Sequence, residues 1–146
     1  MKDPFHESEV AYDVAFKYYT DVSSLSGTAV YSVVQACENA LLALWRSTLG
    51  PKSRTFQLDH QPAKHIKEIG LYPYYSEGTR IYLDKQIEWK LHEVRFEHTK
   101  AYEEYISDAA HGRSKFIIEG TIEFINETKA MIKNQEVIRI IKDFKK

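Results

Sequence analysis

The chain has 146 residues, of which 43% are hydrophobic and 28% are charged, values that are ordinary for one globular domain. The formal net charge of −1 argues against binding driven mainly by bulk charge, whether to nucleic acid or to an anionic membrane. The single cysteine, Cys37, excludes an intramolecular disulfide and fits a reducing compartment. The N-terminus has no apolar core of a secretory signal, and no apolar run approaches the length of a membrane span. We therefore expect a soluble, cytoplasmic protein.

The first predicted helix begins with Ser8 as its N-cap and runs to about Val22. Val10, Val14 and Tyr18 precede Val22 at intervals of four residues, which places all four in one row along a helix. We expect this row to face the core.

The second predicted helix, residues 29–49, is the most apolar stretch of the chain and is closed by Gly50 and Pro51. Residues 35–46 contain no glycine, proline or β-branched residue, so helix propensity is favourable throughout. The apolar stripe is too wide for one neighbouring helix to cover, which predicts a central position in a bundle. Its members are Val33, Ala36, Cys37, Ala40, Leu41, Leu44 and Trp45.

A short helix is predicted over residues 62–69, with a proline at its first position and Gly70 at its end. An aromatic loop, residues 71–78, follows it. We interpret Tyr72 and Tyr75 in this loop as a cap on one end of the bundle, as the floor of a small-ligand pocket, or as a contact surface for a partner.

Residues 79–110 carry a long helical pattern, and periodicity leaves open whether they form one helix or two helices broken near His98. A last long helix is predicted over residues 116–132. Residues 137–144 either extend that helix or form an additional short one. The basic residues at the C-terminus are interpreted as a solvated tail or as a functional basic arm.

These elements predict an all-α protein with one domain over residues 1–146 and a core from about 8 to 135. The expected architecture is an up-and-down bundle of four main helices plus a short inserted helix. The segment 81–106 presents apolar side chains on more than one side, which predicts self-association, with a two-fold homodimer as the expected form. The side chains concerned are Tyr82, Trp89 and Phe96, beside the row of Ile87, Leu91 and Val94.

The densest group of chemically active side-chain types lies between residues 92 and 98, and Arg95 and His98 are its candidate catalytic residues. Because they are three positions apart, they would be neighbours on a helix. An arginine that binds phosphate beside a histidine that shuttles a proton is the minimum for cleaving RNA through its own 2′-hydroxyl. The alternative interpretation is a helix surface with internal Glu–Arg–His pairing, or an inward-facing, hydrogen-bonded His98.

No metal site is predicted, because the Glu-x-x-His pairs of carboxylate-bridged bundles are missing from this sequence. Trp89 stands three residues before His92, and Arg95 stands three residues before His98. The sequence also has no glycine-rich phosphate loop and no Cys-x-x-Cys pair, so we expect no cofactor.

His60 stands immediately before the predicted short helix, where we expect it to cap or contact a helix N-terminus. Together with Tyr72, Tyr75 and Arg95, it is a candidate ligand-binding residue. These positions are far apart in the sequence, so spacing alone does not predict whether they meet.

The order of these motifs resembles the HEPN superfamily of helical domains, and the similarity covers roughly residues 9–132. Residues 34–44, VQACENALLAL, look like the Q-x-x-E-x-A-L-K-A-L signature of the second helix in that family. Residues 60–66, HQPAKHI, look like its H-D-L-x-x-L element. Residues 93–98, EVRFEH, fall where members carry an A-R-Y stretch or the R-N-x-x-x-H ribonuclease motif. The resemblance implies a homodimer and partnership with a separately encoded nucleotidyltransferase.

Ribonuclease members of that family separate the arginine and the histidine by four to six residues, whereas only two residues separate Arg95 from His98, and Phe96 replaces the usual polar residue. We therefore expect a non-catalytic interaction module that binds nucleotide, RNA or a nucleotidyltransferase partner. The alternative is a metal-independent, toxin-type endoribonuclease that uses Arg95 and His98.

Overall fold

The computed structural model describes residues 3–22, 25–53, 59–107 and 110–145, apart from the side chains of 8, 11, 15, 18–22 and 110–112. Within these ranges the chain forms α-helices, short 3-10 helices and turns but no strand, which confirms the all-α fold. None of the helices described is both long enough and apolar enough to cross a membrane.

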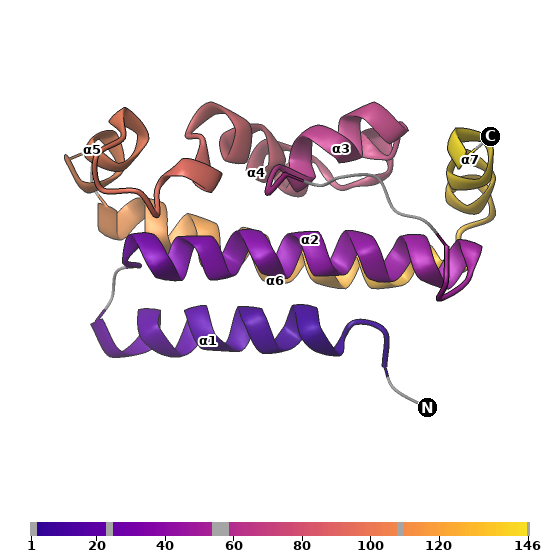
Figure 1. The fold of residues 1–146 in the computed structure, drawn as a ribbon, viewed down its shortest axis with the longest axis horizontal. Helices are drawn as coiled ribbons and strands as arrows, with labels where there is room; N and C mark the ends of the chain where they lie inside the picture. Colours follow the sequence, from indigo (N-terminus) through magenta and orange to yellow (C-terminus); the bar gives the residue numbers. More distant parts are fainter. Residues whose placement is uncertain (1–2, 23–24, 54–58, 108–109, 146) are drawn as a thin grey trace.

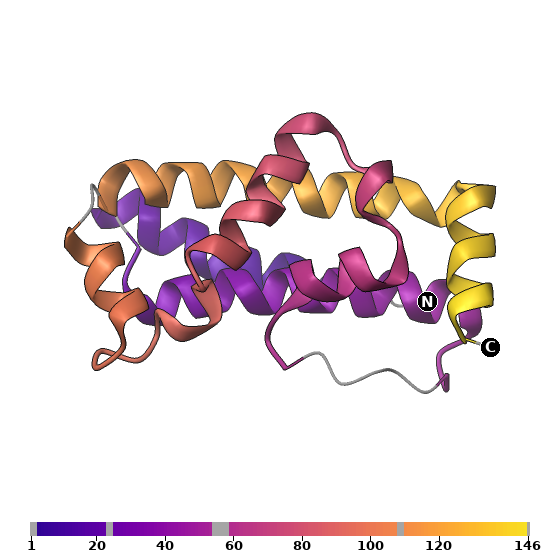
Figure 2. The same ribbon diagram turned by 90° about the horizontal axis from the view of Figure 1, so that it is seen from above.

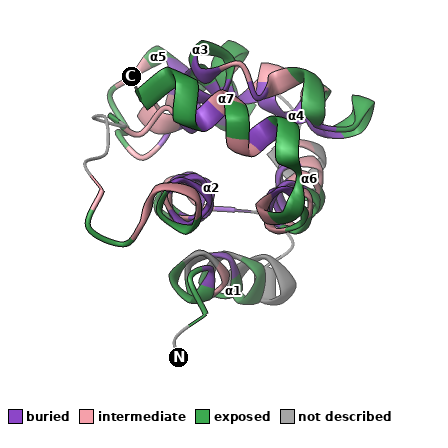
Figure 3. Ribbon diagram, turned by 90° about the vertical axis from the view of Figure 1, so that its right-hand side faces the viewer, coloured by how far each residue is buried: buried purple, intermediate pink, exposed green. Residues whose placement is uncertain are grey.

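The helices are arranged in three layers (Figure 1). In the middle layer α2 (Gly27–Leu49) and α6 (Ala110–Ala130) lie side by side, as Figure 3 shows, and α1 (His6–Val22) covers one side of this pair. Shorter helices cover the other side: α3 (Pro62–Ile69), α4 (Glu77–Glu88) and α5 (Lys100–Ser107). Because α2 has neighbours on both sides, its residues meet side chains from several parts of the chain.

The position of α2 at the centre is confirmed, since all residues of its predicted apolar stripe are buried. Its boundaries also follow from local chemistry. The Ser26 hydroxyl accepts a hydrogen bond from the Ala29 N–H at 3.1 Å, which caps the N-terminus. Gly50 ends the helix with φ of +106°, a conformation that side-chain-bearing residues rarely adopt.

The predicted inward row of α1 is wrong, because Val10 and Val14 are 46% and 59% exposed. Phe5 and Tyr12 are buried instead, and together they remove more apolar area from water than two valines would. The helix begins at His6, two residues before the predicted N-cap, and the Asp3 carboxylate accepts a hydrogen bond from the Phe5 N–H at 2.9 Å. The side chains of Ser8, Tyr18 and Val22, which the prediction also used, lie outside the described ones.

The long pattern over residues 79–110 is divided into two helices, so three long helices replace the four that the sequence predicts. The break follows Glu88, the last residue of α4, and includes Lys90, which has φ of +49°, and a 3-10 turn, η2 (Leu91–Glu93). Leu91 and Val94 are fully buried on this broken segment, which contacts both α2 and α4. The apolar spacing therefore does not mark one continuous helical face, because Leu91 and Val94 are buried on the broken segment while Ile87, before the break, is exposed.

The C-terminal segment forms a separate short helix, α7 (Gln135–Lys145), after a 3-10 turn, η3 (Met131–Lys133). The Asn134 side chain caps α7 by accepting hydrogen bonds from the N–H groups of Glu136 and Val137 at 3.0 and 3.2 Å. Figure 2 shows that α7 lies across the end of the molecule where α2 and α6 finish. Of the two possibilities for this segment, the additional helix is confirmed.

Candidate functional site

His60 is held by Glu38 of α2, and the N-cap position of α3, which is one of the placements predicted for His60, belongs to the next residue. The carboxylate of Glu38 lies 3.0 Å from the backbone nitrogen of His60 and 3.1 Å from its Nδ1. Glu38 is only 8% exposed, so these contacts satisfy a carboxylate that would otherwise be buried without partners. The chain reaches this position through left-handed conformations at Asp59 and His60, with φ of +44° and +64°. The N-cap position of α3 is occupied by Gln61, whose side chain makes no capping bond.

Tyr31 joins His60 to Arg95, although the two are 35 positions apart in sequence. The Tyr31 hydroxyl lies 3.5 Å from Nε2 of His60, and the two rings meet edge to face with centroids 5.2 Å apart. On the same ring, the guanidinium carbon of Arg95 lies 3.9 Å from the centroid. We call Tyr31, Glu38, His60 and Arg95 the Tyr31 cluster. Sequence reasoning missed Tyr31 and gave Glu38 no role, although their spacing of seven places both on one face of α2.

Within the part of the chain that the structure describes, the guanidinium of Arg95 has cation–π partners but no ion-pair partner. It lies between Tyr31 and Phe96, with its carbon 4.4 Å from the centroid of the Phe96 ring. Its Nε is buried without a hydrogen bond, and no described carboxylate forms an ion pair with the side chain. Stacking of this kind fixes the plane of an arginine and leaves its N–H edges available for a planar anion.

A cavity of about 170 Å³ lies beside Arg95 at the N-terminus of α2. Its lining includes Gly27, Thr28, Glu97 and Tyr102. A Cβ on Gly27 would lie 2.6 Å from the carbonyl oxygen of Val94, so the glycine allows the chain that carries Arg95 to pack directly on α2. The N–H groups in the first turn of a helix favour negative charge, so the side of this cavity formed by α2 and Arg95 suits an anion, whereas the Glu97 carboxylate in the lining opposes one.

The spacing of Arg95 and His98 predicts that they are neighbours on a helix, and this prediction is wrong. Residues 94–99 form turns between η2 and α5 instead. The side chain of His98 is exposed, and its ring centroid lies 6.1 Å from that of Phe96. Phe96 therefore contacts both predicted catalytic residues.

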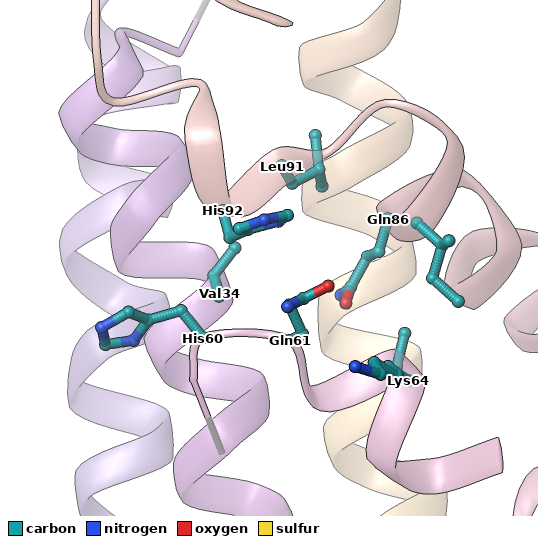
Figure 4. A pocket seen from close by; sticks show the side chains of 9 residues that line it. Val34, His60, Gln61, Lys64, Gln86, Leu91 and His92 are labelled. Carbon is teal, nitrogen blue, oxygen red and sulfur yellow. The ribbon is translucent and has the colours of Figure 1, made fainter. Parts of the chain in front are cut away.

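A second, smaller pocket lies on the other side of His60, between α3 and α4 (Figure 4). Its polar lining includes Gln61, Gln86 and His92, and its volume of about 10 Å³ is roughly the space that one water needs. Burial is the main cause that lowers the pKa of His92, so its imidazole favours the neutral form. Figure 4 shows the ring of His60 turned away from the amides of Gln61 and Gln86, and His60 is the residue that the small pocket shares with the Tyr31 cluster.

Tyr72 and Tyr75 are held at the opposite end of the bundle. The Tyr72 hydroxyl donates to the Asp84 carboxylate at 2.9 Å, and the ammonium of Lys67 lies over the Tyr72 ring and 2.8 Å from Asp84. Tyr75 is buried, with its ring stacked on Phe124 and its hydroxyl 2.8 Å from that of Thr128. Their contacts tie the aromatic loop to the bundle. In the described structure they do not join His60 or Arg95.

Cys37 is not in a position to act as a nucleophile. The thiol is fully buried, and burial raises its pKa to about 11. Among the described residues there is also no group of three or more histidine, cysteine, aspartate or glutamate side chains that could hold a metal ion.

Comparison of the chain with protein families, with curated proteins and with solved structures found no match in any of the three. The candidate site therefore stands on its own geometry, in which Arg95 and His60 meet on Tyr31.

Proposed function

We propose that the chain is a HEPN-like, non-catalytic binding module that takes a nucleotide or RNA at the Tyr31 cluster. The observation that carries this proposal is the unpaired guanidinium of Arg95, stacked between Tyr31 and Phe96 at the edge of a cavity. A stacked arginine without a carboxylate partner is suited to bidentate contact with a phosphate.

The surroundings of Arg95 support a nucleotide over a free anion. Phe96 is 41% exposed and offers a ring face on which a base can stack. The first turn of α2 adds favourable potential for phosphate on the other side of the guanidinium. Because the whole chain has a net charge of −1, binding depends on these local contacts and not on overall attraction.

The arrangement of His60 supports binding without catalysis. Its Nδ1 contacts Glu38 at 3.1 Å, and its Nε2 faces the Tyr31 hydroxyl at 3.5 Å. Both ring nitrogens therefore have protein partners. In this role His60 positions Tyr31 beneath Arg95.

The test is calorimetric titration of the protein with adenosine monophosphate and with a short single-stranded oligoadenylate. We expect Arg95→Gln to weaken binding about tenfold or more, because a charge-assisted hydrogen bond to phosphate is lost. Arg80→Gln is the matched control, since the Nε of Arg80 is also buried without a partner but lies on α4, away from the cavity. Equal affinities of wild type and Arg95→Gln would refute the proposal.

A second candidate function is metal-independent cleavage of RNA by Arg95 and His98. The observation that favours it is the shared contact of both side chains with Phe96. In that case cleavage of single-stranded RNA would persist in EDTA and fall roughly 10²-fold or more in His98→Ala. The proposal of a non-catalytic module instead expects no cleavage by wild type. Robust cleavage by wild type that is lost in a correctly folded His98→Ala variant would overturn that proposal.

We also propose that the chain forms a homodimer and works with a nucleotidyltransferase partner. Large apolar side chains on the surface support self-association, and they include Val10 and Val14 on α1 and Ile81 and Ile87 on α4. The nucleotidyltransferase partner is supported by the HEPN resemblance alone. Co-expression with a nucleotidyltransferase encoded beside the gene, followed by affinity purification, tests it, and failure of the two chains to co-purify would argue against it.

A further inference from the structure

The outer face of α1 carries four exposed residues at spacings of three, four and three: Glu7, Val10, Val14 and Lys17. We call them the α1 seam. This spacing is that of the facing positions in a pair of packed helices. Figures 1 and 3 show α1 as an outer layer that the rest of the chain covers on one side only. The seam is on the uncovered side, because Phe5 and Tyr12 fill the side toward the core.

The seam is apolar at its centre and charged at its ends. Val14 is 59% exposed, the highest value among the exposed large hydrophobic residues of the described chain. Glu7 and Lys17 form no ion pair with any described residue. By contrast, Glu9, on the inner side of the same helix, is paired with Lys129 of α6. Glu7 and Lys17, which flank the exposed valines, are therefore among the charges of α1 that have no ion-pair partner in the described structure, and the exposed Asp13 is another.

The order of these residues makes the seam complementary to itself. If two copies of α1 cross antiparallel about a two-fold axis at Tyr12, each residue faces the one equally far from Tyr12 on the opposite side. Val10 then faces Val14 of the second copy, and Glu7 faces Lys17 of the second copy. A two-fold contact repeats each of these pairs, so two apolar contacts lie between two identical ion pairs, each of which joins opposite charges.

We propose that the α1 seam is the surface through which a second copy of this chain binds, in an antiparallel, two-fold arrangement. The inference rests on the proposed self-association and names the surface responsible for it. That surface differs from the segment 81–106, on which the sequence-based prediction of self-association rests. A contact limited to one helix per copy is at the low end of interface sizes, so we expect a reversible dimer that dissociates on dilution.

Charge reversal tests the register as well as the surface. In sedimentation velocity at high micromolar concentration, we expect wild type to be dimeric, and Glu7→Lys and Lys17→Glu each to weaken the dimer about tenfold or more through like-charge contacts. Mixing the two variants in equal amounts restores opposite charges at both ends, so the mixture should dimerise while each variant alone does not. If the mixture stays monomeric under conditions where wild type is dimeric, the antiparallel register is wrong.

A charge introduced at an apolar position distinguishes two outcomes: that this surface is wrong, and that the chain does not self-associate at all. We expect Val14→Asp to abolish the dimer, and the matched control Ile81→Asp, which changes an exposed residue of α4, to leave it intact. If Ile81→Asp abolishes the dimer and Val14→Asp does not, the chain self-associates but not through the α1 seam. A monomeric wild type would reject both. Because both positions are exposed, unchanged melting temperatures should confirm that each variant is folded.

Discussion

The two ends of the molecule each place a cation over a tyrosine ring, but only one of them also supplies an anion. Lys67 lies over Tyr72 and pairs with Asp84 at 2.8 Å. Arg95 lies over Tyr31 and has no described carboxylate partner. A cation whose charge is already neutralised serves the fold, whereas one held in place by aromatic contacts alone keeps its capacity for an external anion. This difference separates the aromatic loop from the candidate binding site.

The largest effect is expected when Arg95 receives a carboxylate of its own. Thr28 is exposed and lines the cavity beside Arg95, so Thr28→Glu places a carboxylate where we expect the ligand phosphate. Nucleotide affinity should fall at least about tenfold, since the new ion pair competes with the phosphate. The melting temperature should stay the same or rise, because a glutamate in the first turn of α2 suits the helix dipole. Thr28→Gln is the control, and an equal loss of affinity in both variants would contradict the competition.

A smaller effect is expected from removing the support beneath the cluster. Glu38→Ala takes away the acceptor of both His60 contacts and should lower the free energy of unfolding by about 1–3 kcal/mol. In a protein of this size each kcal/mol corresponds to about 2–4 °C of melting temperature, so calorimetry will detect the change. Glu68→Ala is the matched control, because Glu68 pairs with His65 at the surface and is 49% exposed. If both variants melt alike, Glu38 does not hold the cluster.

The smallest effect is expected at the paired end. The ion pair with Lys67, followed by the hydrogen bond from Tyr72, lowers the pKa of Asp84. The stability that this carboxylate contributes is therefore present above the pKa of the unfolded group, about 4, and is lost as the pH falls through the lower folded value. Asp84→Asn should reduce the free energy of unfolding by less than about 1 kcal/mol near neutral pH, because the pair is solvent-exposed.

The same substitution also has a pH signature. The difference between wild type and Asp84→Asn should disappear in acid, where the wild-type carboxyl is neutral as well. Denaturant titrations at neutral and acidic pH measure it, and a gap that widens in acid would contradict the assignment. Nucleotide affinity should not change in this variant, because Asp84 is outside the Tyr31 cluster.

The local chemistry of the sequence is sufficient to predict several elements of this fold. The apolar stripe and Gly50 define α2, the proline at the first position and Gly70 define α3, and both helices occur as predicted. These features depend on residues close together in the chain, where propensity, capping and periodicity act directly. The fold class follows from them, because every strong pattern in the sequence is helical.

Tertiary packing decided what the sequence left open or predicted wrongly. After α4 ends at Glu88, the positive φ of Lys90 turns the chain so that Leu91 and Val94 are buried against the bundle, and α1 turns Tyr12 inward in place of Val10. The candidate site is the clearest example. Its members come from α2, from the turn before α3 and from the chain after η2, so their spacing in sequence says nothing about their distances in space. Only packing of these segments on α2 brings His60 and Arg95 to one tyrosine ring.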